Sequence, residues 1–119
     1  MIGKLETVVL DAREPHKLAR FYAELLGAEI TTDEPDWVTI TEPSGRRLSF
    51  QTSPEHRPPM FPDPAGSQQL HLDIRVDDIE DAHRKVLALG ATRVPDAIEP
   101  NSFRVFRDPA GHTFCLVWD

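Results

Sequence analysis

The sequence is poor in cysteine, in long apolar runs and in clustered positive charge, and each shortage excludes a class of protein. The 119-residue chain has one cysteine, Cys115, so no disulfide can form within it. The apolar runs, such as residues 8–10, fall far short of the roughly 20 residues that cross a bilayer. No apolar signal segment opens the chain. We therefore expect a cytoplasmic protein that makes no membrane contact.

Charge argues against a nucleic-acid partner. The chain carries 13 lysines and arginines against 20 aspartates and glutamates, a net charge of −7, and its positive side chains are scattered. Such a surface repels a phosphate backbone on average. The length suits one domain over residues 1–119, since domains typically run about 100–150 residues.

Proline is abundant and unevenly placed. Five of the 11 prolines fall within residues 54–64. Proline removes a backbone donor and fixes φ, which excludes a helix or an inner strand there. We predict a semi-extended connector over 53–68, with a first module over 4–52 and a second over 69–118.

The two modules resemble each other in sequence. Three pairs of segments match in the same order: 7–10 with 71–74, 26–28 with 89–91, and 37–50 with 103–116. The last pair keeps a constant offset of 66 residues and has two strand patterns around an acid-Pro-x-Gly turn. Three ordered matches favour a duplicated unit.

Each module is predicted to run strand, helix, strand, strand, strand. In the first, Pro15 suits the first helical turn and Gly27 the helix end. In the second, Asp77 followed by Glu80 resembles a capping box, and Gly90 ends the helix. The predicted fold class is α+β, with two βαβββ modules forming a curved mixed sheet around a cleft.

Four motifs carry a resemblance to a known family. They are Phe-Tyr-x-x-Leu-Leu-Gly at 21–27, His-Leu-Asp through Val-Asp-Asp at 71–78, Leu-Gly-Ala at 89–91, and Asp-Pro-Ala-Gly-His at 108–112. With them the whole chain resembles the vicinal oxygen chelate superfamily, and most of all its small glyoxalase-like domain proteins. The resemblance implies the paired-module fold of the glyoxalase, bleomycin-resistance and dioxygenase proteins. Because one fold supports many different reactions, the resemblance does not identify the reaction of this protein.

The resemblance also implies a divalent metal held by the first and last strand of each module. The matching positions here are Thr7, Ser49, His71 and Cys115, and only His71 has a usual residue type. Hydroxyl groups are poor ligands for transition metals. A site made of His71, Asp73 and Cys115 is conceivable, but adjacent-strand geometry does not favour convergence of all three. We therefore expect no metal cofactor.

His71 and Asp73 are the candidate acid–base pair, since they share one face of a strand. The alternative, a core histidine bonded to Asp73 or to backbone, has equal weight. Cys115 is expected to line the ligand site as a small buried side chain, which is favoured over a reactive thiol activated by His71.

In the first module, Arg47 and Gln51 are candidate ligand-binding groups beside Thr7. Ser49 is expected mainly to leave space. Strand alternation places Glu6 on the face opposite Thr7. Trp37 is predicted first as a core residue and only second as pocket lining.

The predicted function is binding of a small organic ligand in the cleft between the modules, without the usual metal site. The alternative is an enzyme of the lyase, isomerase or dioxygenase type, acting through His71 and Asp73 at an altered or metal-free site. A protein-binding role has only the proline-rich connector in its favour. The expected partner is a small molecule. The sequence leaves open whether the chain forms a homodimer that exchanges modules.

Overall fold

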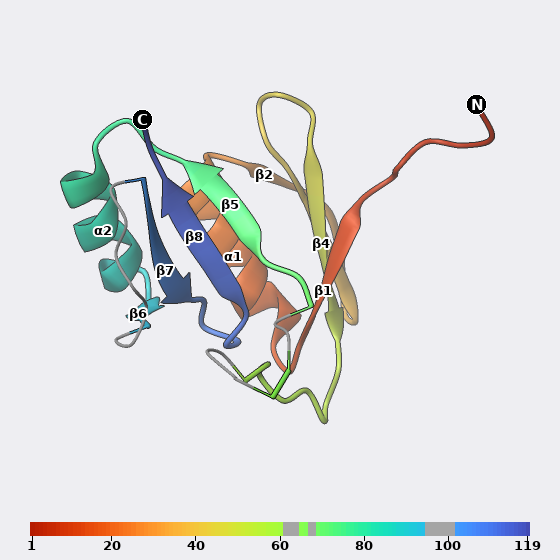
Figure 1. The fold of residues 1–119 in the computed structure, drawn as a ribbon. Helices are drawn as coiled ribbons and strands as arrows, with labels where there is room; N and C mark the ends of the chain where they lie inside the picture. Colours follow the sequence, from red (N-terminus) through yellow and green to blue (C-terminus); the bar gives the residue numbers. More distant parts are fainter. Residues whose placement is uncertain (61–64, 67–68, 95–101) are drawn as a thin grey trace. The chain divides into compact units, whose positions relative to one another are not determined.

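The computed structural model describes residues 1–60, 65–66, 69–94 and 102–119 of the chain. The chain divides into two compact units, Met1–His56 and Arg57–Asp119. Within these described residues, each unit contains four strands and one helix in the order βαβββ (Figure 1). This order confirms the predicted α+β fold class with two βαβββ modules.

The first unit is a mixed four-stranded sheet with a helix on one face. Its elements are β1 (Val8–Ala12), α1 (Pro15–Leu26), β2 (Glu29–Glu34), β3 (Trp37–Thr41) and β4 (Arg47–Thr52). The strand order is β1-β4-β3-β2, with β1 parallel to β4 and the other pairs antiparallel.

The second unit repeats this plan. Its elements are β5 (Leu72–Arg75), α2 (Ile79–Ala88), β6 (Thr92–Arg93), β7 (Phe103–Arg107) and β8 (Thr113–Val117). The strand order is β5-β8-β7-β6, and β5 runs parallel to β8. The register is also repeated: Val9 pairs with Ser49 in the first unit, and Asp73 pairs with Cys115 at the same places in the second.

The core of the first unit lies between α1 and one face of its sheet. Helix α1 begins with Pro15 in its first turn and ends at Gly27, which has the left-handed φ of 63° that glycine tolerates best. Tyr22 and Phe50 are fully buried and stack with ring centroids 5.8 Å apart. Since strand side chains alternate, the neighbours of Phe50 point to the opposite face.

The second unit has apolar residues on both sheet faces. On the α2 side, Phe106 stacks on Phe114 at 5.6 Å. On the other face, Val94, Val105 and Cys115 form a small buried cluster. Cys115 is thus a small buried side chain, as expected.

Helix α2 is capped one residue later than predicted. Asp78, not Asp77, is the N-cap residue, and its side chain accepts a hydrogen bond from the backbone N–H of Asp81 at 3.1 Å. Both adjacent aspartates are residue types that cap helices, and Asp78 is the one that directly precedes the first helical residue, Ile79.

The proline-rich stretch packs against the β7–β8 turn. Among the described residues of 53–68 there is neither helix nor strand, while 61–64 and 67–68 lie outside the described part. Arg107 donates hydrogen bonds to the carbonyl oxygens of Pro59 at 2.9 Å and Gly111 at 2.8 Å. Pro58 lies so close to Gly111 that a Cβ there would come within 2.4 Å of the proline ring. The stretch is therefore fixed to the hairpin at this point.

No helix within the described ranges is both long enough and apolar enough to span a bilayer.

Candidate functional site

A groove of about 470 Å³ lies on the first unit, on the sheet face that α1 does not cover. The residues around it are polar, apart from one indole. They are Glu6, Thr7, Thr31, Thr32, Trp37, Thr39, Thr41, Arg47 and Ser49. The alternation of β3 accounts for three of them, since Trp37, Thr39 and Thr41 are two residues apart and share a face.

Four of these side chains form one hydrogen-bonded chain. The indole Nε1 of Trp37 lies 2.9 Å from Thr39 Oγ1, which lies 2.8 Å from Ser49 Oγ. Ser49 Oγ in turn lies 2.9 Å from Thr7 Oγ1. Ser49 does not merely leave space, as the sequence suggested, because its buried hydroxyl links two strands.

Trp37 determines which group donates and which accepts in each hydrogen bond of this series. An indole nitrogen can only donate, so Thr39 accepts from it. The hydroxyl of Thr39 is buried and needs an acceptor of its own, which Ser49 supplies, and buried Ser49 donates to Thr7 for the same reason. The donors therefore point from Trp37 towards Thr7. The half-buried Thr7 hydroxyl lies at the groove, where its own donor makes only a long hydrogen bond, 3.5 Å, to the carbonyl oxygen of Val8.

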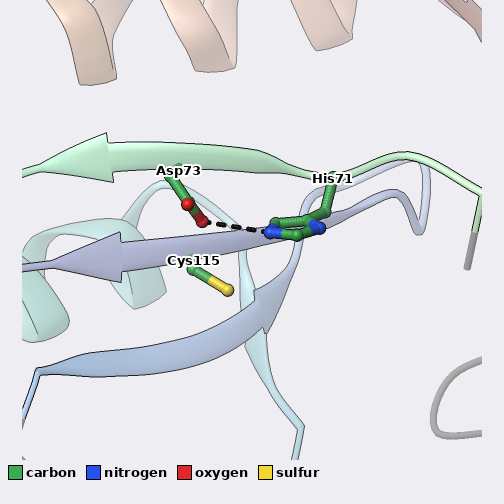
Figure 2. A group of neighbouring side chains, drawn as sticks. All are labelled: His71, Asp73 and Cys115. Atoms are coloured by element: carbon green, nitrogen blue, oxygen red, sulfur yellow. Dashed lines mark ion pairs between the residues drawn. The ribbon is translucent and has the colours of Figure 1, made fainter.

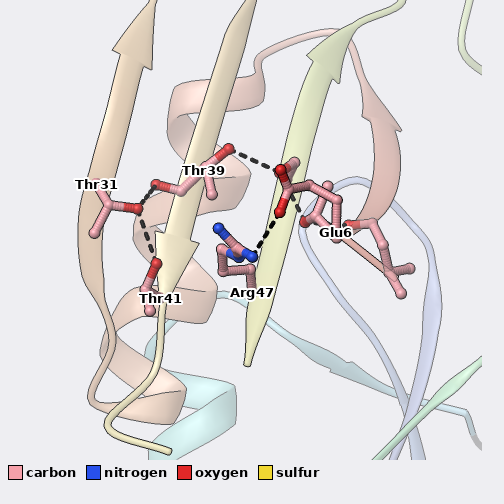
Figure 3. Close-up of polar contacts among 8 residues, drawn as sticks. Glu6, Thr31, Thr39, Thr41 and Arg47 are labelled. Carbon is pink, nitrogen blue, oxygen red and sulfur yellow. Dashed lines mark hydrogen bonds and ion pairs between the residues drawn. The ribbon is translucent and has the colours of Figure 1, made fainter. Parts of the chain in front are cut away.

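Arg47 and Glu6 form an ion pair at the groove, with Arg47 Nη2 2.6 Å from Glu6 Oε1 (Figure 3). The prediction that Glu6 faces away from Thr7 is wrong. Strand β1 begins only at Val8, so the alternation of an extended strand does not apply to residue 6. Both charged side chains are exposed, and the pair contributes little to stability.

Gln51 lies outside the residues that line the groove. It continues the row of Arg47 and Ser49 along β4, but its side chain donates to Asp11 Oδ1 at 2.7 Å. Trp37 does line the groove, so its second predicted role is the one that the structure supports.

The second unit brings together His71, Asp73 and Cys115 (Figure 2). His71 Nε2 lies 3.1 Å from Asp73 Oδ1, and one ligand atom from each of the three residues lies within 4.8 Å of the others. The expectation that adjacent strands do not bring the three together is wrong. The parallel register of β5 and β8 sets Asp73 opposite Cys115, and His71, directly before β5, lies on the same side in contact with Asp73.

The Cys115 thiol is protonated near neutral pH. Burial raises its pKa to about 11, and the negative charge of Asp73 and the hydrogen bond that the thiol donates to it act in the same direction. An activated cysteine has a lowered pKa. Cys115 is therefore no nucleophile in this environment.

The four positions that the resemblance assigns to a metal do not fit one. Thr7 and Ser49 offer neutral hydroxyls, which bind transition metals poorly. Their oxygens are also hydrogen-bonded to each other at 2.9 Å, and Ser49 is fully buried. Of the four, only His71 and Cys115 carry suitable donor atoms, both in the second unit.

Sequence reasoning missed four groove residues: Thr31, Thr32, Thr39 and Thr41. The alternation of β3 is a signal that would have identified two of them. The other two depend on an irregularity in β2, where the register shifts between Ile30 and Thr32. Such a bulge lets consecutive residues face one side, and no sequence pattern here predicts it.

Comparison with known proteins identifies the family to which the chain belongs. The profile of the glyoxalase-like domain family matches residues 7–117. No curated protein matches the chain significantly. Among solved structures, the chain is similar to a glyoxalase/bleomycin resistance protein/dioxygenase family enzyme from Burkholderia phytofirmans, with 17% sequence identity, a TM-score of 0.73 and 98% of each chain covered.

Two further structures show the same fold. The fosfomycin resistance protein FosX from Listeria monocytogenes is 15% identical, with a TM-score of 0.74, 100% of this chain and 95% of that chain covered. A structure described as oxidase ChaP-H2 is 21% identical, with a TM-score of 0.64 and the same two coverages, 100% and 95%. Because the family profile spans nearly the whole length and agrees with the motifs, the chain belongs to the glyoxalase-like domain family.

Proposed function

We propose that this protein binds a small organic ligand in the groove of its first unit, and that this binding requires no metal ion. One observation carries the proposal: the hydrogen-bonded chain from Trp37 ends in the groove at Thr7. A row of hydroxyls with fixed donor direction is a preorganised polar surface. Preorganised groups lose little freedom when a ligand binds.

The groove residues indicate the ligand's chemistry. Thr7 offers a hydroxyl whose hydrogen bond to Val8 O, at 3.5 Å, is long enough for a ligand to replace it. Arg47 offers further donors once its contact with exposed Glu6 loosens. The indole of Trp37 adds a flat apolar surface. These groups suit a molecule with acceptor oxygens, such as a carboxylate, amide or polyol, beside a small apolar part. A volume of about 470 Å³ is in the usual range for small-molecule sites.

The similar structures support a small organic ligand in general terms. One is described as a fosfomycin resistance protein and another as a member of a glyoxalase/bleomycin resistance protein/dioxygenase family. Both names refer to action on or protection from small molecules. They do not name the ligand of this chain.

The proposal is tested by a thermal-shift screen with carboxylates, amides and polyols. A compound that binds the native state raises the melting temperature. We expect Thr7→Val to weaken binding of each hit by about tenfold, the effect of losing roughly one hydrogen bond. Gln51→Ala is the matched control, because Gln51 lies on the same sheet but does not line the groove. Hits that bind Thr7→Val as tightly as the unmodified chain would contradict the groove as the site.

A second candidate is acid–base catalysis of the lyase or isomerase type at His71. It is favoured by the 3.1 Å contact between His71 Nε2 and Asp73 Oδ1, which orients the ring and leaves Nδ1 to accept a proton.

Its test is deuterium exchange of α-protons in carbonyl compounds, followed by proton NMR in D2O on chelator-treated protein. We expect His71→Ala to lower the exchange rate by about 100-fold or more. Arg75→Ala, at an exposed position further along the same strand, should leave the rate unchanged. An equal fall in the exchange rate of both variants, or no exchange with the unmodified chain, would argue against acid–base catalysis by His71.

A further inference from the structure

Three side chains of the second unit converge from the neighbouring strands β5 and β8 and from the residue directly before β5. Asp73 and Cys115 are opposite each other in the parallel pair β5–β8, and His71 lies two residues before Asp73. All three side chains extend towards one space on the same side of the sheet (Figure 2). Their nitrogen, oxygen and sulfur ligand atoms lie within 4.8 Å of one another.

This set of donors suits zinc. Zn²⁺ takes imidazole nitrogen, carboxylate oxygen and thiolate sulfur at about 2.0–2.3 Å, so tetrahedral ligands stand roughly 3.5 Å apart. His71 Nε2 and Asp73 Oδ1 already lie 3.1 Å apart. Both side chains are partly exposed, 38% and 58%, and can rotate, whereas Cys115 is buried and fixed. A small rotation therefore brings all three donors to bonding distance of one ion.

We propose that the second unit binds a thiophilic divalent cation, with Zn²⁺ the best fit, through His71, Asp73 and Cys115. These residues supply three ligands and leave the fourth coordination position open. Binding replaces the S–H bond of Cys115 with a metal–sulfur bond and releases the proton to water, so the carboxylate and thiolate together balance the charge of the ion. Mg²⁺, Ca²⁺ and Mn²⁺ prefer all-oxygen ligands and are excluded by this donor set.

The proposal departs from what the family resemblance implies. There, each module contributes a ligand from its first and its last strand. Here the first unit has Thr7, Val9 and Ser49 at the positions equivalent to the three donors. Two of these are hydroxyls bonded to each other, and the third is apolar. The site therefore belongs to one unit, and Asp73 replaces the ligands that the first unit lacks. The earlier expectation of no metal assumed that the three donors stay apart.

The experiment is a Co²⁺ titration of the full, tag-free chain, followed by optical absorption. We expect one equivalent of Co²⁺ to give a near-ultraviolet sulfur-to-cobalt charge-transfer band and visible bands of a tetrahedral ion. Zn²⁺ should displace it, and Mg²⁺ should not. Cys115→Ser should remove the charge-transfer band. Asp73→Asn, an exposed change that does not disturb the core, should weaken Co²⁺ binding at least about tenfold.

Thr7→Ala and Ser49→Ala are the matched controls, since they alter the equivalent positions of the first unit. We expect both to bind Co²⁺ like the unmodified chain. The proposal is overturned if no charge-transfer band appears, if Asp73→Asn binds as tightly as the unmodified chain, or if the two controls weaken binding as much as Asp73→Asn. The last result would indicate a site shared by both units. The outcome is independent of ligand binding in the groove.

Discussion

Replacing Gly111 with alanine is expected to lower the free energy of unfolding by about 2–5 kcal/mol. Two costs add in this variant. Gly111 has a φ of +89°, and a side chain in that region costs about 1–2 kcal/mol. The new Cβ would also come within 2.4 Å of Pro58, and such overpacking costs about 1–3 kcal/mol. Chemical denaturation of the purified variant measures the combined loss in the free energy of unfolding.

The repeat supplies the matched control for this change. Gly45 is the equivalent turn residue of the first unit, with a φ of +94° and nothing within 4 Å of a built Cβ. Gly45→Ala should therefore show only the conformational cost of about 1–2 kcal/mol. Equal effects at the two glycines would contradict close packing of the proline-rich stretch on the β7–β8 turn.

Phe50→Ala is expected to destabilise the first unit by about 3–5 kcal/mol, as is typical when a buried phenylalanine is truncated. The ring is fully buried and stacks on Tyr22 of α1 at 5.8 Å. Loss of this ring leaves a cavity between helix and sheet. Intrinsic fluorescence and circular dichroism during denaturation measure the loss.

Ile30→Ala is a suitable comparison, because Ile30 is 43% exposed on the edge strand β2. Ile30→Ala should lower the free energy of unfolding by less than about 1 kcal/mol. Similar losses at Phe50 and Ile30 would contradict the assignment of sheet faces. That assignment matters for function, since Ser49, next to Phe50, points into the groove only if Phe50 points to the helix.

The fold was largely predictable because its signals are local and repeated. Pro15, Gly27 and the acid-Pro-x-Gly turns mark element ends directly, and the constant offset between 37–50 and 103–116 pairs the two hairpins. Where two residues carried the same signal, the choice was wrong: Asp78 rather than Asp77 caps α2.

The sites were less predictable, because they depend on register and on irregular backbone. Alternation along one strand placed His71 beside Asp73, but the convergence with Cys115 depends on the pairing of β5 with β8. The bulge at Thr31 and the start of β1 after Glu6 brought further residues to the groove. None of these three features has a signature in a single sequence.

The two units present different chemistry at equivalent positions. In the first, hydroxyls bond to one another and end at a groove. In the second, the same positions carry a histidine and a thiol beside a carboxylate. The repeated framework thus carries different side chains at equivalent positions, and the roles proposed above for the two units rest on these few differences.

The most direct test of ligand binding is a ¹H–¹⁵N NMR titration of the full chain with the strongest hit from the thermal-shift screen. We expect the largest amide shifts at the residues that line the groove, such as Thr7, Thr39 and Ser49. We also expect Thr7→Val to reduce those shifts at equal ligand concentration. Largest shifts away from the groove residues, unchanged shifts in Thr7→Val, or a library without any hit would contradict ligand binding in the groove.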